Sequence, residues 1–337
     1  MKILWEAFYY KCILLLITCL IVFPVFVIGQ DKLNVQIKSL FDVFDNPEIP
    51  GGFAVAVIHN GKMLYKNGYG HVNSETTTPF TTNTVSEYAS VSKQFVGLAI
   101  AILVDEERIS LNDDIRTYLP EVPDFGSKIT IGHLLYHTSG IRDWVGLVKI
   151  SGRYEEDVIT DDLLMRLVTH QKELNFKPGD QFQYSNNGYF LLARIVSRVT
   201  NQSFRDWMQE NIFIPLEMNN THFNDNYREV VINRADSYKY MDGSYGNCTS
   251  NKEGYGASSL FSTIDDMIKW VHNFEKKKVG NEAVWQMMFT KGRLNNGKEI
   301  DYGFGFSIRM DNDQLCYEHG GSWCGYLSQL FYRKMDF

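Results

Sequence analysis

The spacing of apolar side chains predicts a helix and a hairpin before residue 80. Apolar residues recur at helical spacing from Leu33 to Phe44, and Asn46-Pro47 marks the end of that segment. The stretch FAVAVIHNGKMLYKNGYG (53–70) has the pattern of two strands instead. They are joined by Asn60-Gly61, a strong short signal for a β-hairpin.

Helical patterns dominate the middle of the chain. An uncharged apolar run, FVGLAIAILV (95–104), predicts a buried helix that begins at about Ser90 and ends near residues 105–106. Further helical segments are ITIGHLLYH (129–137), EDVITDDLLMRLVTHQ (156–171), NGYFLLARIVSRVT (187–200), SFRDWMQENIF (203–213) and TIDDMIKWVHNF (263–274). Strand patterns return in YGFGFSIRM (302–310), QLCYEHGG (314–321) and YLSQLFYR (326–333), with turns expected at 311–313 and 322–324.

Strands at both ends with helices between them predict an α+β fold. We expect one antiparallel sheet built from both chain ends, with flanking helices and an inserted, mostly helical domain. The sheet domain is assigned to residues 31–80 and 285–337, the helical domain to 81–284, and a cleft is expected where they meet. Because the chain stops at Phe337 directly after a strand, we expect the sequence to be a fragment without its true C-terminus.

The first 29 residues are excluded from the fold. Lys2 and Lys11 precede an uncharged apolar stretch from Cys12 to Gly29, which is typical of a signal peptide cleaved before Gln30. An uncleaved N-terminal membrane anchor is the alternative. In both cases the positive charges precede the apolar stretch, so the remaining chain is expected outside the cytoplasm, periplasmic or secreted.

Charge and cysteine content exclude several classes of function. The net charge is −7, with acidic and basic residues interspersed, which argues against a nucleic-acid partner. After the apolar segment only Cys248, Cys316 and Cys324 remain, with no zinc-site spacing. Free, semi-buried thiols are the favoured interpretation, and a Cys316–Cys324 pair across a hairpin is the alternative.

Ser90 and Lys93 stand at the start of the apolar helix, three residues apart. Burial and the positive end of a helix both disfavour the ammonium form of a lysine. A neutral Lys93 could act as a general base on the Ser90 hydroxyl, because residues three apart share a helical face. The backbone N–H of Ser90 could also donate to an oxyanion. The alternative is a capping serine beside a solvated lysine.

A proton-transferring tyrosine would complete such a site. The pattern Tyr-x-Asn occurs at Tyr65, Tyr184 and Tyr245, so the pattern alone is unspecific. Tyr65 lies in the predicted hairpin, where an aromatic residue is ordinary packing, and Tyr245 lies in a Gly/Ser-rich loop. Tyr184 follows a turn and precedes a helix, a rigid setting, and is therefore preferred. A third element, His319-Gly320-Gly321, ends a predicted strand, where glycines allow close approach to a ligand.

The three motifs together resemble the serine β-lactamase-like, penicillin-binding family, nearest its class C branch. They are SVSK (90–93), YSN (184–186) and HGG (319–321), supported by stretches such as FKPGDQFQYSNNGYF and DYGFGFS. The resemblance covers roughly residues 33 to 337. It implies Ser90 as the acylated nucleophile, Lys93 as its base and Tyr184 as the proton shuttle. It further implies that Asn186 holds the substrate amide and the lysine, and that the N–H groups of Ser90 and Ser322 form the oxyanion hole.

Departures from the family pattern limit the expected activity. Class C lactamases usually have lysine where this chain has His319, which is largely neutral at pH 7 with its ordinary pKa of about 6.5. β-Lactamase activity is therefore expected as a side reaction at best. Ser258-Ser259 replace a common Gly-Gly, and the family's final strand and C-terminal helix are absent from the sequence.

The sequence thus predicts an exported serine hydrolase that cleaves a peptide, an amide or an ester through an acyl-enzyme, without metal or organic cofactor. The expected partner is a small-molecule or peptide substrate, with cell-wall peptide as one candidate, and membrane contact only through the N-terminal segment. Two alternatives are a sensor that is acylated without turnover and an inactive fragment. His133 and His137 have metal-ligand spacing, but core and capping roles are preferred because no third ligand is evident. The sequence contains no Gly-x-Ser-x-Gly motif, so the nucleophile elbow that would support an α/β-hydrolase is absent.

Overall fold

The computed structural model describes residues 30–41 and 49–334. The predicted signal or anchor segment, Phe44 and the Asn46-Pro47 stop lie outside these residues. The first described helix, α2 (Gln30–Phe41), confirms the helix expected there. Within the described ranges no helix combines the length and the apolar character that a bilayer span requires.

The predicted hairpin forms as expected. Strands β1 (Gly52–His59) and β2 (Lys62–Asn73) pair antiparallel, and Asn60 and Gly61 both adopt positive φ, as the tight hairpin turn requires. Helix α2 packs on this hairpin, where Ile37, Phe41 and Tyr69 form a small core of their own. Tyr65 lies in β2 and its hydroxyl hydrogen-bonds that of Tyr69, in agreement with a packing role.

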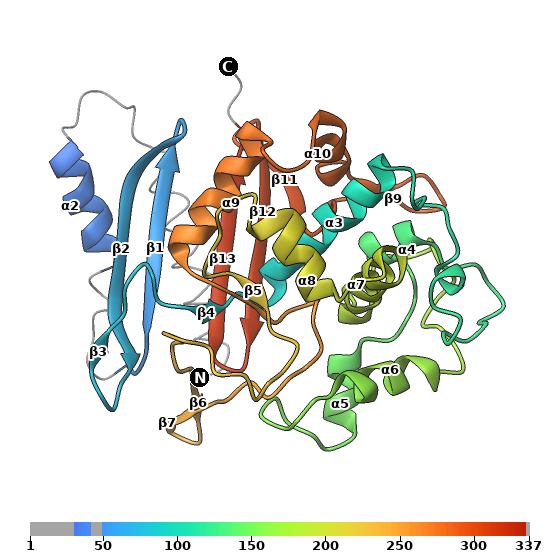
Figure 1. Ribbon diagram of the computed structural model, residues 1–337, viewed down its shortest axis with the longest axis horizontal. Coiled ribbons are helices and arrows are strands. Elements are labelled where there is room, and N and C mark those ends of the chain that lie inside the picture. Colours follow the sequence, from blue (N-terminus) through green and yellow to red (C-terminus); the bar gives the residue numbers. More distant parts are fainter. Residues whose placement is uncertain (1–29, 42–48, 335–337) are drawn as a thin grey trace.

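The two ends of the chain form two antiparallel sheets, not one hydrogen-bonded sheet, among the residues that the structure describes. One sheet has the order β1-β2-β3 and the other the order β11-β12-β13. The elements that complete these sheets are β3 (Thr78–Pro79), β11 (Ser307–Asp311), β12 (Gln314–Trp323) and β13 (Tyr326–Arg333). Helix α9 (Ile264–Lys276) contacts both sheets, because Asp265 pairs with Lys66 of β2 and Phe274 packs on Tyr332 of β13 (Figure 1).

The segment between the sheets is mostly helical, as predicted. Figure 1 shows these helices on the side of β11–β13 that lies away from the hairpin. They are α3 (Lys93–Asp105), α4 (Ile131–Leu135), α5 (Trp144–Ile150), α6 (Asp161–Thr169), α7 (Asn186–Thr200), α8 (Phe204–Met208) and α10 (Glu282–Met288), with single turns η2 (Ala89–Ser92), η3 (Ile115–Thr117) and η4 (Gln209–Phe213). Short strands complete the description: β4 (Ser86–Glu87), β5 (His222–Phe223), β6 (Tyr238–Met241), β7 (Ser244–Asn247), β8 (Leu260–Ser262), β9 (Gly292–Arg293) and β10 (Glu299–Ile300).

One large core joins the helices to the second sheet. Helix α3 lies at its centre: Phe95 and Leu98 are fully buried, and Phe95 stacks on Trp270 of α9 with ring centroids 4.0 Å apart. The same core includes Phe306 and Tyr317 from the region of β11 and β12. The α+β class is thus confirmed, whereas the assigned domain boundaries remain a prediction.

Two local expectations are corrected by the structure, and one helix is added to those that the sequence predicts. Strand β12 continues through Ser322 and Trp323, and the turn to β13 is made by Cys324 and Gly325, both with positive φ. Tyr245 lies in β7, paired with Tyr240 of β6, so it is fixed by a hairpin. Residues 142–160 contain α5, a short helix that the apolar pattern did not reveal.

The interpretation of the cysteines as free thiols is wrong for two of them. Cys248 and Cys324, 76 residues apart in sequence, form a disulfide, whereas Cys316 is free and buried. The spacing of the cysteines in the sequence could not predict this pairing, because only the tertiary fold brings the segment after β7 next to the turn after β12.

Removing this disulfide is expected to lower the free energy of unfolding by about 4 kcal/mol, because the bond closes a long loop in the unfolded chain. Thermal unfolding of the wild type with and without reductant measures the effect. The double variant Cys248→Ser/Cys324→Ser should melt at the lower temperature and be insensitive to reductant. Equal melting temperatures for the wild type and the double variant would contradict the structural role.

Candidate active site

Ser90 lies in the single 3₁₀ turn η2, directly before α3, and Lys93 is the first residue of α3. In a 3₁₀ turn, residues three apart lie in line along the axis. The Lys93 Nζ atom is accordingly 3.1 Å from the Ser90 Oγ atom. The turn is entered through Ala89, a buried residue with a φ of 44°, a conformation that L-residues rarely adopt.

The Lys93 amine has three hydrogen-bonding partners and is shielded from solvent. Its side chain is fully buried, and besides Ser90 it contacts the Asn186 Oδ1 atom at 2.9 Å and the Ala257 carbonyl at 2.7 Å. Both of those oxygens can only accept a hydrogen bond. A neutral amine therefore donates its two N–H groups to them and turns its lone pair towards the Ser90 hydroxyl. This is the arrangement that a general base needs.

Burial also sets the protonation state of this amine. Desolvation lowers the pKa of Lys93 from 10.5 to about 7, the Asp143 carboxylate opposes this shift, and the Lys252 ammonium adds to it. A substantial fraction of Lys93 is thus neutral at physiological pH.

Asp143 orients the Asn186 amide towards Lys93. Asp143 accepts hydrogen bonds from the Asn186 backbone N–H at 3.0 Å and from Nδ2 at 3.1 Å. With Nδ2 engaged in this way, Oδ1 faces the Lys93 amine. Burial raises the pKa of Asp143, and the hydrogen bonds from Asn186 and the charge of Lys93 oppose that change.

His137 holds the segment that carries Tyr184 through hydrogen bonds to its backbone. The His137 Nδ1 atom accepts the backbone N–H of Ser185 at 3.2 Å, and the His137 carbonyl accepts the N–H of Gln183 at 2.9 Å. The ring of His137 lies 4.3 Å from that of Tyr184 between centroids. His137 therefore has a structural role, and burial lowers its pKa well below the usual value, so it is neutral.

The Tyr184 ring lies close to both Lys93 and His319. The Lys93 Nζ atom is 4.9 Å from the Tyr184 ring centroid, and the Tyr184 ring is 6.1 Å from that of His319. Tyr184 is 36% exposed, yet desolvation of its phenol raises the pKa above the ordinary value of 10, and a hydrogen bond with Ser90 partly offsets this change. The phenol is thus protonated at neutral pH, which makes Lys93 the better base and Tyr184 an acid.

His319 carries no charge in this structure. Its Nε2 atom lies 3.0 Å from the Tyr302 hydroxyl, and its Nδ1 atom lies 2.6 Å from the Gly320 carbonyl. Because a carbonyl only accepts, Nδ1 carries the proton and Nε2 accepts from Tyr302. Burial and the charge of Lys93 lower the pKa of His319 to about 3. The site therefore has no permanent cation at the position of the histidine.

Strand β12 approaches the Ser90 turn closely because residue 321 is glycine. A Cβ atom on Gly321 would lie 2.4 Å from the Tyr88 carbonyl and 3.0 Å from the Ser90 nitrogen. Ser328 of β13 strengthens this contact by donating its hydroxyl to the Tyr88 carbonyl at 2.8 Å. Ser322 follows Gly321 on β12, paired with Leu327. The chain thus places the HGG motif against Ser90, and the oxyanion role of the Ser90 and Ser322 N–H groups remains a prediction.

The family model for Beta-lactamase matches residues 43–334, which is most of the chain. The chain belongs to the beta-lactamase family.

The chain is similar to penicillin-binding proteins and D-aminopeptidases. The chain is 28% identical over 327 residues to a penicillin-binding protein of Bacillus subtilis (strain 168), covering 89% of this chain and 69% of that protein. It is 27% identical over 289 residues to a D-aminopeptidase of Gluconobacter oxydans (strain 621H), covering 83% of this chain and 52% of that one. The chain therefore spans about half the length of this D-aminopeptidase. A penicillin-binding protein homologue from Pyrococcus abyssi, described as octameric, has the same fold, with a TM-score of 0.77, 24% identity, and coverage of 89% of this chain and 71% of that one.

Sequence reasoning missed several residues that shape this beta-lactamase-family site. Asp143, Ala257 and Tyr302 contact Asn186, Lys93 and His319 respectively. None has a local spacing to Ser90 that could reveal it. His133, by contrast, forms a capping box with Thr130 at the start of α4, in agreement with the capping role preferred over metal binding.

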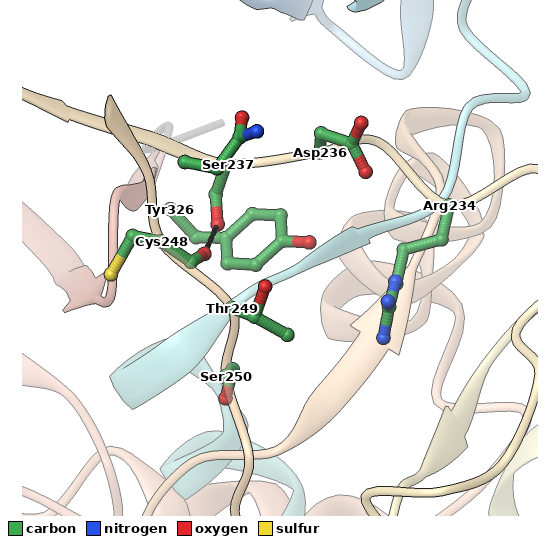
Figure 2. Close-up of a pocket in the computed structure, with 8 residues that line it drawn as sticks. Arg234, Asp236, Ser237, Cys248, Thr249, Ser250 and Tyr326 are labelled. Atoms are coloured by element: carbon green, nitrogen blue, oxygen red, sulfur yellow. Dashed lines mark hydrogen bonds between the residues drawn. The ribbon is translucent and has the colours of Figure 1, made fainter. Parts of the chain in front are cut away.

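A polar cavity of about 110 Å³ lies beyond the predicted site residues and contains none of them. Figure 2 shows Arg234, Asp236 and Tyr326 around it. Its full lining is Arg234, Asp236, Ser237, Asn247, Cys248, Thr249, Ser250 and Tyr326. It adjoins the site through Ser250, whose Oγ atom accepts the Trp323 Nε1–H at 3.1 Å.

Replacing Asp143 with asparagine is expected to move the acidic limb of the activity profile to lower pH. The Asp143 carboxylate raises the pKa of Lys93, so its removal lowers that pKa and leaves the base neutral in more acidic solution. The rate above the limb should fall roughly tenfold, because asparagine keeps only one of the two acceptor oxygens that hold the Asn186 backbone and side chain. The pH dependence of kcat/KM measures both effects. A limb at unchanged or higher pH would show that Asp143 does not act on Lys93.

Proposed function

We propose that the chain is an exported serine hydrolase that cleaves a peptide, an amide or an ester through an acyl-enzyme on Ser90. The observation that carries this proposal is the buried Lys93 amine, 3.1 Å from the Ser90 hydroxyl and bound to two carbonyl oxygens. Export is proposed from the charge and hydropathy of residues 1–29, with membrane contact only if that segment remains attached. The reaction requires no metal or organic cofactor.

In the proposed reaction, Lys93 takes the proton of the Ser90 hydroxyl while Oγ attacks the substrate carbonyl carbon. The N–H groups of Ser90 and Ser322 stabilise the resulting oxyanion. Tyr184 donates its proton to the leaving group as the carbonyl–leaving-group bond breaks, and it regains a proton from Lys93. Water then attacks the acyl group by the reverse relay and releases Ser90.

Substrates of the D-amino peptide and amide class are proposed first, since the relatives include D-aminopeptidases. The neutral His319 supplies no cation for a substrate carboxylate, so β-lactams are proposed as poor substrates. Cell-wall peptide remains a candidate within the same class.

The experiment combines a fluorophosphonate label with a panel of substrates: a D-alanine anilide, a short-chain aryl ester and a chromogenic cephalosporin. We expect labelling at Ser90 and turnover of the anilide or ester, with the cephalosporin slowest. Persistent stoichiometric acylation by every substrate, without turnover, would favour the sensor alternative. A folded protein without any labelling would contradict the proposed function.

A further inference from the structure

A buried ion pair stands directly beside the proposed site and has no part in the reaction described above. Glu87 ends β4, three residues before Ser90, and Lys252 lies between β7 and β8. Their side chains are 0% and 1% exposed, and the Lys252 Nζ atom lies 3.0 Å from the Glu87 Oε1 atom. Moving two charges from water into the interior costs desolvation free energy, and pairing often offsets that cost only in part. Stability alone therefore does not explain why this pair is buried.

Glu87 fixes both ends of the segment 252–259. Its Oε1 atom accepts from Lys252 Nζ at one end and from the backbone N–H of Ser259 at the other, at 3.1 Å. Ser259 has a φ of 67° and donates its hydroxyl to the Gly254 carbonyl, which closes the segment on itself.

The middle of that segment contacts the proposed catalytic turn. The Ala257 carbonyl accepts from Lys93 Nζ at 2.7 Å, and the Gly256 carbonyl accepts from the Ser92 hydroxyl at 3.0 Å. Glu87 thus binds both ends of the segment whose middle supplies the carbonyl that accepts from Lys93.

Lys252 connects the same segment to the end of β12. Its Nζ atom lies 4.3 Å from the Trp323 ring centroid, a cation–π contact, and Trp323 follows the proposed oxyanion donor Ser322. The Cys248–Cys324 disulfide joins the two segments a second time. Figure 2 shows Cys248, Thr249 and Ser250 in succession along the chain that precedes this segment.

We propose that Glu87 and Lys252 are positioning residues for acyl transfer: the pair holds the 252–259 segment against Lys93 and, through Trp323, aligns the end of β12. This inference rests on the proposed function. Glu87 bonds Lys252 and the Ser259 N–H, and Lys252 contacts Trp323, so both act on the site through other residues.

The charges around Lys93 make this role measurable. Asp143 faces Lys93 from the segment before α5, His137 and His319 are neutral, and Tyr184 and Tyr189 are protonated phenols. Burial lowers the pKa of Lys252, and the carboxylates of Glu87 and, at longer range, Glu155 oppose this change and favour its ammonium form. Its charge lowers the pKa of Lys93, so removing it should raise that pKa.

The test compares Lys252→Met with the double variant Glu87→Gln/Lys252→Met in the pH dependence of fluorophosphonate labelling at Ser90. In Lys252→Met we expect the acidic limb to move to higher pH, which lowers the rate at pH 6 severalfold. The rate above the limb should also fall, because Glu87 no longer anchors the segment at residue 252. Lys66→Met, which removes a lysine from a surface ion pair with Asp265, is the matched control and should leave the limb unchanged.

The double variant keeps the inference testable if Lys252→Met does not fold, since it leaves no unpaired buried charge. The side-chain amide oxygen that Glu87→Gln introduces can still accept from the Ser259 N–H. Residue 252 is released in both variants, but only Lys252→Met leaves Glu87 as an unpaired buried charge, so we expect the rate above the limb to fall less in the double variant than in Lys252→Met, while its limb remains above that of the wild type. Limbs within about 0.2 pH units of wild type and unchanged rates in the folded variants would overturn the positioning role alone. A wild-type protein that is never labelled would overturn the proposed function and, with it, this role.

Discussion

Ser90→Ala is expected to abolish covalent labelling and to reduce hydrolysis by roughly 10⁴-fold or more, the range seen when a nucleophile is removed from an acyl-transfer site. The melting temperature should stay within about 2 °C of wild type, since the half-buried side chain loses a single oxygen. The partner of that hydroxyl, Lys93, keeps its contacts with Asn186 and Ala257.

Labelling followed by peptide mapping, together with thermal unfolding, measures these effects. Ser151→Ala is a matched control, because that hydroxyl donates to the Val148 carbonyl at the end of α5, away from the residues of the proposed site. Residual labelling of Ser90→Ala at the wild-type rate would place the nucleophile elsewhere. A large loss of stability would show that Ser90 is a core residue.

Lys93→Met is expected to slow acylation by roughly 10²–10⁴, the usual contribution of a general base, and at the same time to stabilise the fold. Keeping Lys93 at a pKa of about 7 in the folded state, against 10.5 in the unfolded chain, destabilises the protein by about 5 kcal/mol below pH 7. Methionine fills a similar volume without that charge. It leaves the Ala257 carbonyl and the Asn186 Oδ1 atom without a donor, which offsets part of the gain, about 1–3 kcal/mol for each group.

The sign of this effect follows from proton linkage. The unfolded chain binds a proton at Lys93 between about pH 7 and 10.5, whereas the folded protein does not, so wild-type stability rises with pH over that range. The advantage of Lys93→Met should therefore be largest below pH 7 and shrink by about 1.4 kcal/mol per pH unit above it.

Denaturant unfolding of both proteins at pH 6 and pH 9 measures the difference. A stability difference that does not change with pH would mean that Lys93 stays protonated in the folded protein. Acylation by Lys93→Met within a few-fold of wild type would remove Lys93 from the mechanism.

The features that local patterns predict well are those made by neighbouring residues. Asn60-Gly61 predicts its hairpin because only a few residue pairs accept two positive φ angles in succession. Ser90 and Lys93 meet because a single turn separates them, whether that turn is α-helical or 3₁₀. Tyr184 could be preferred over Tyr65 because a strand residue has ordinary packing to explain it.

The features that sequence patterns did not predict depend on contacts between distant segments. The carbonyl of Ala257 and the carboxylate of Glu87 reach Lys93 and Lys252 across 164 and 165 residues of chain. The periodicity of apolar residues cannot predict contacts between segments so far apart in the chain. The Cys248–Cys324 disulfide could not be predicted for the same reason. The separation of the two sheets also depends on tertiary packing, because each strand has a similar pattern in either arrangement.

The central claim is that a neutral Lys93 activates Ser90, and the rate of Ser90 phosphonylation as a function of pH tests it most directly. We expect peptide mapping to find the adduct on Ser90, with a rate that rises through an apparent pKa near 7, a rise that Lys93→Met should lack. A rate independent of pH from about 5 to 9, or an adduct on another residue, would contradict the claim.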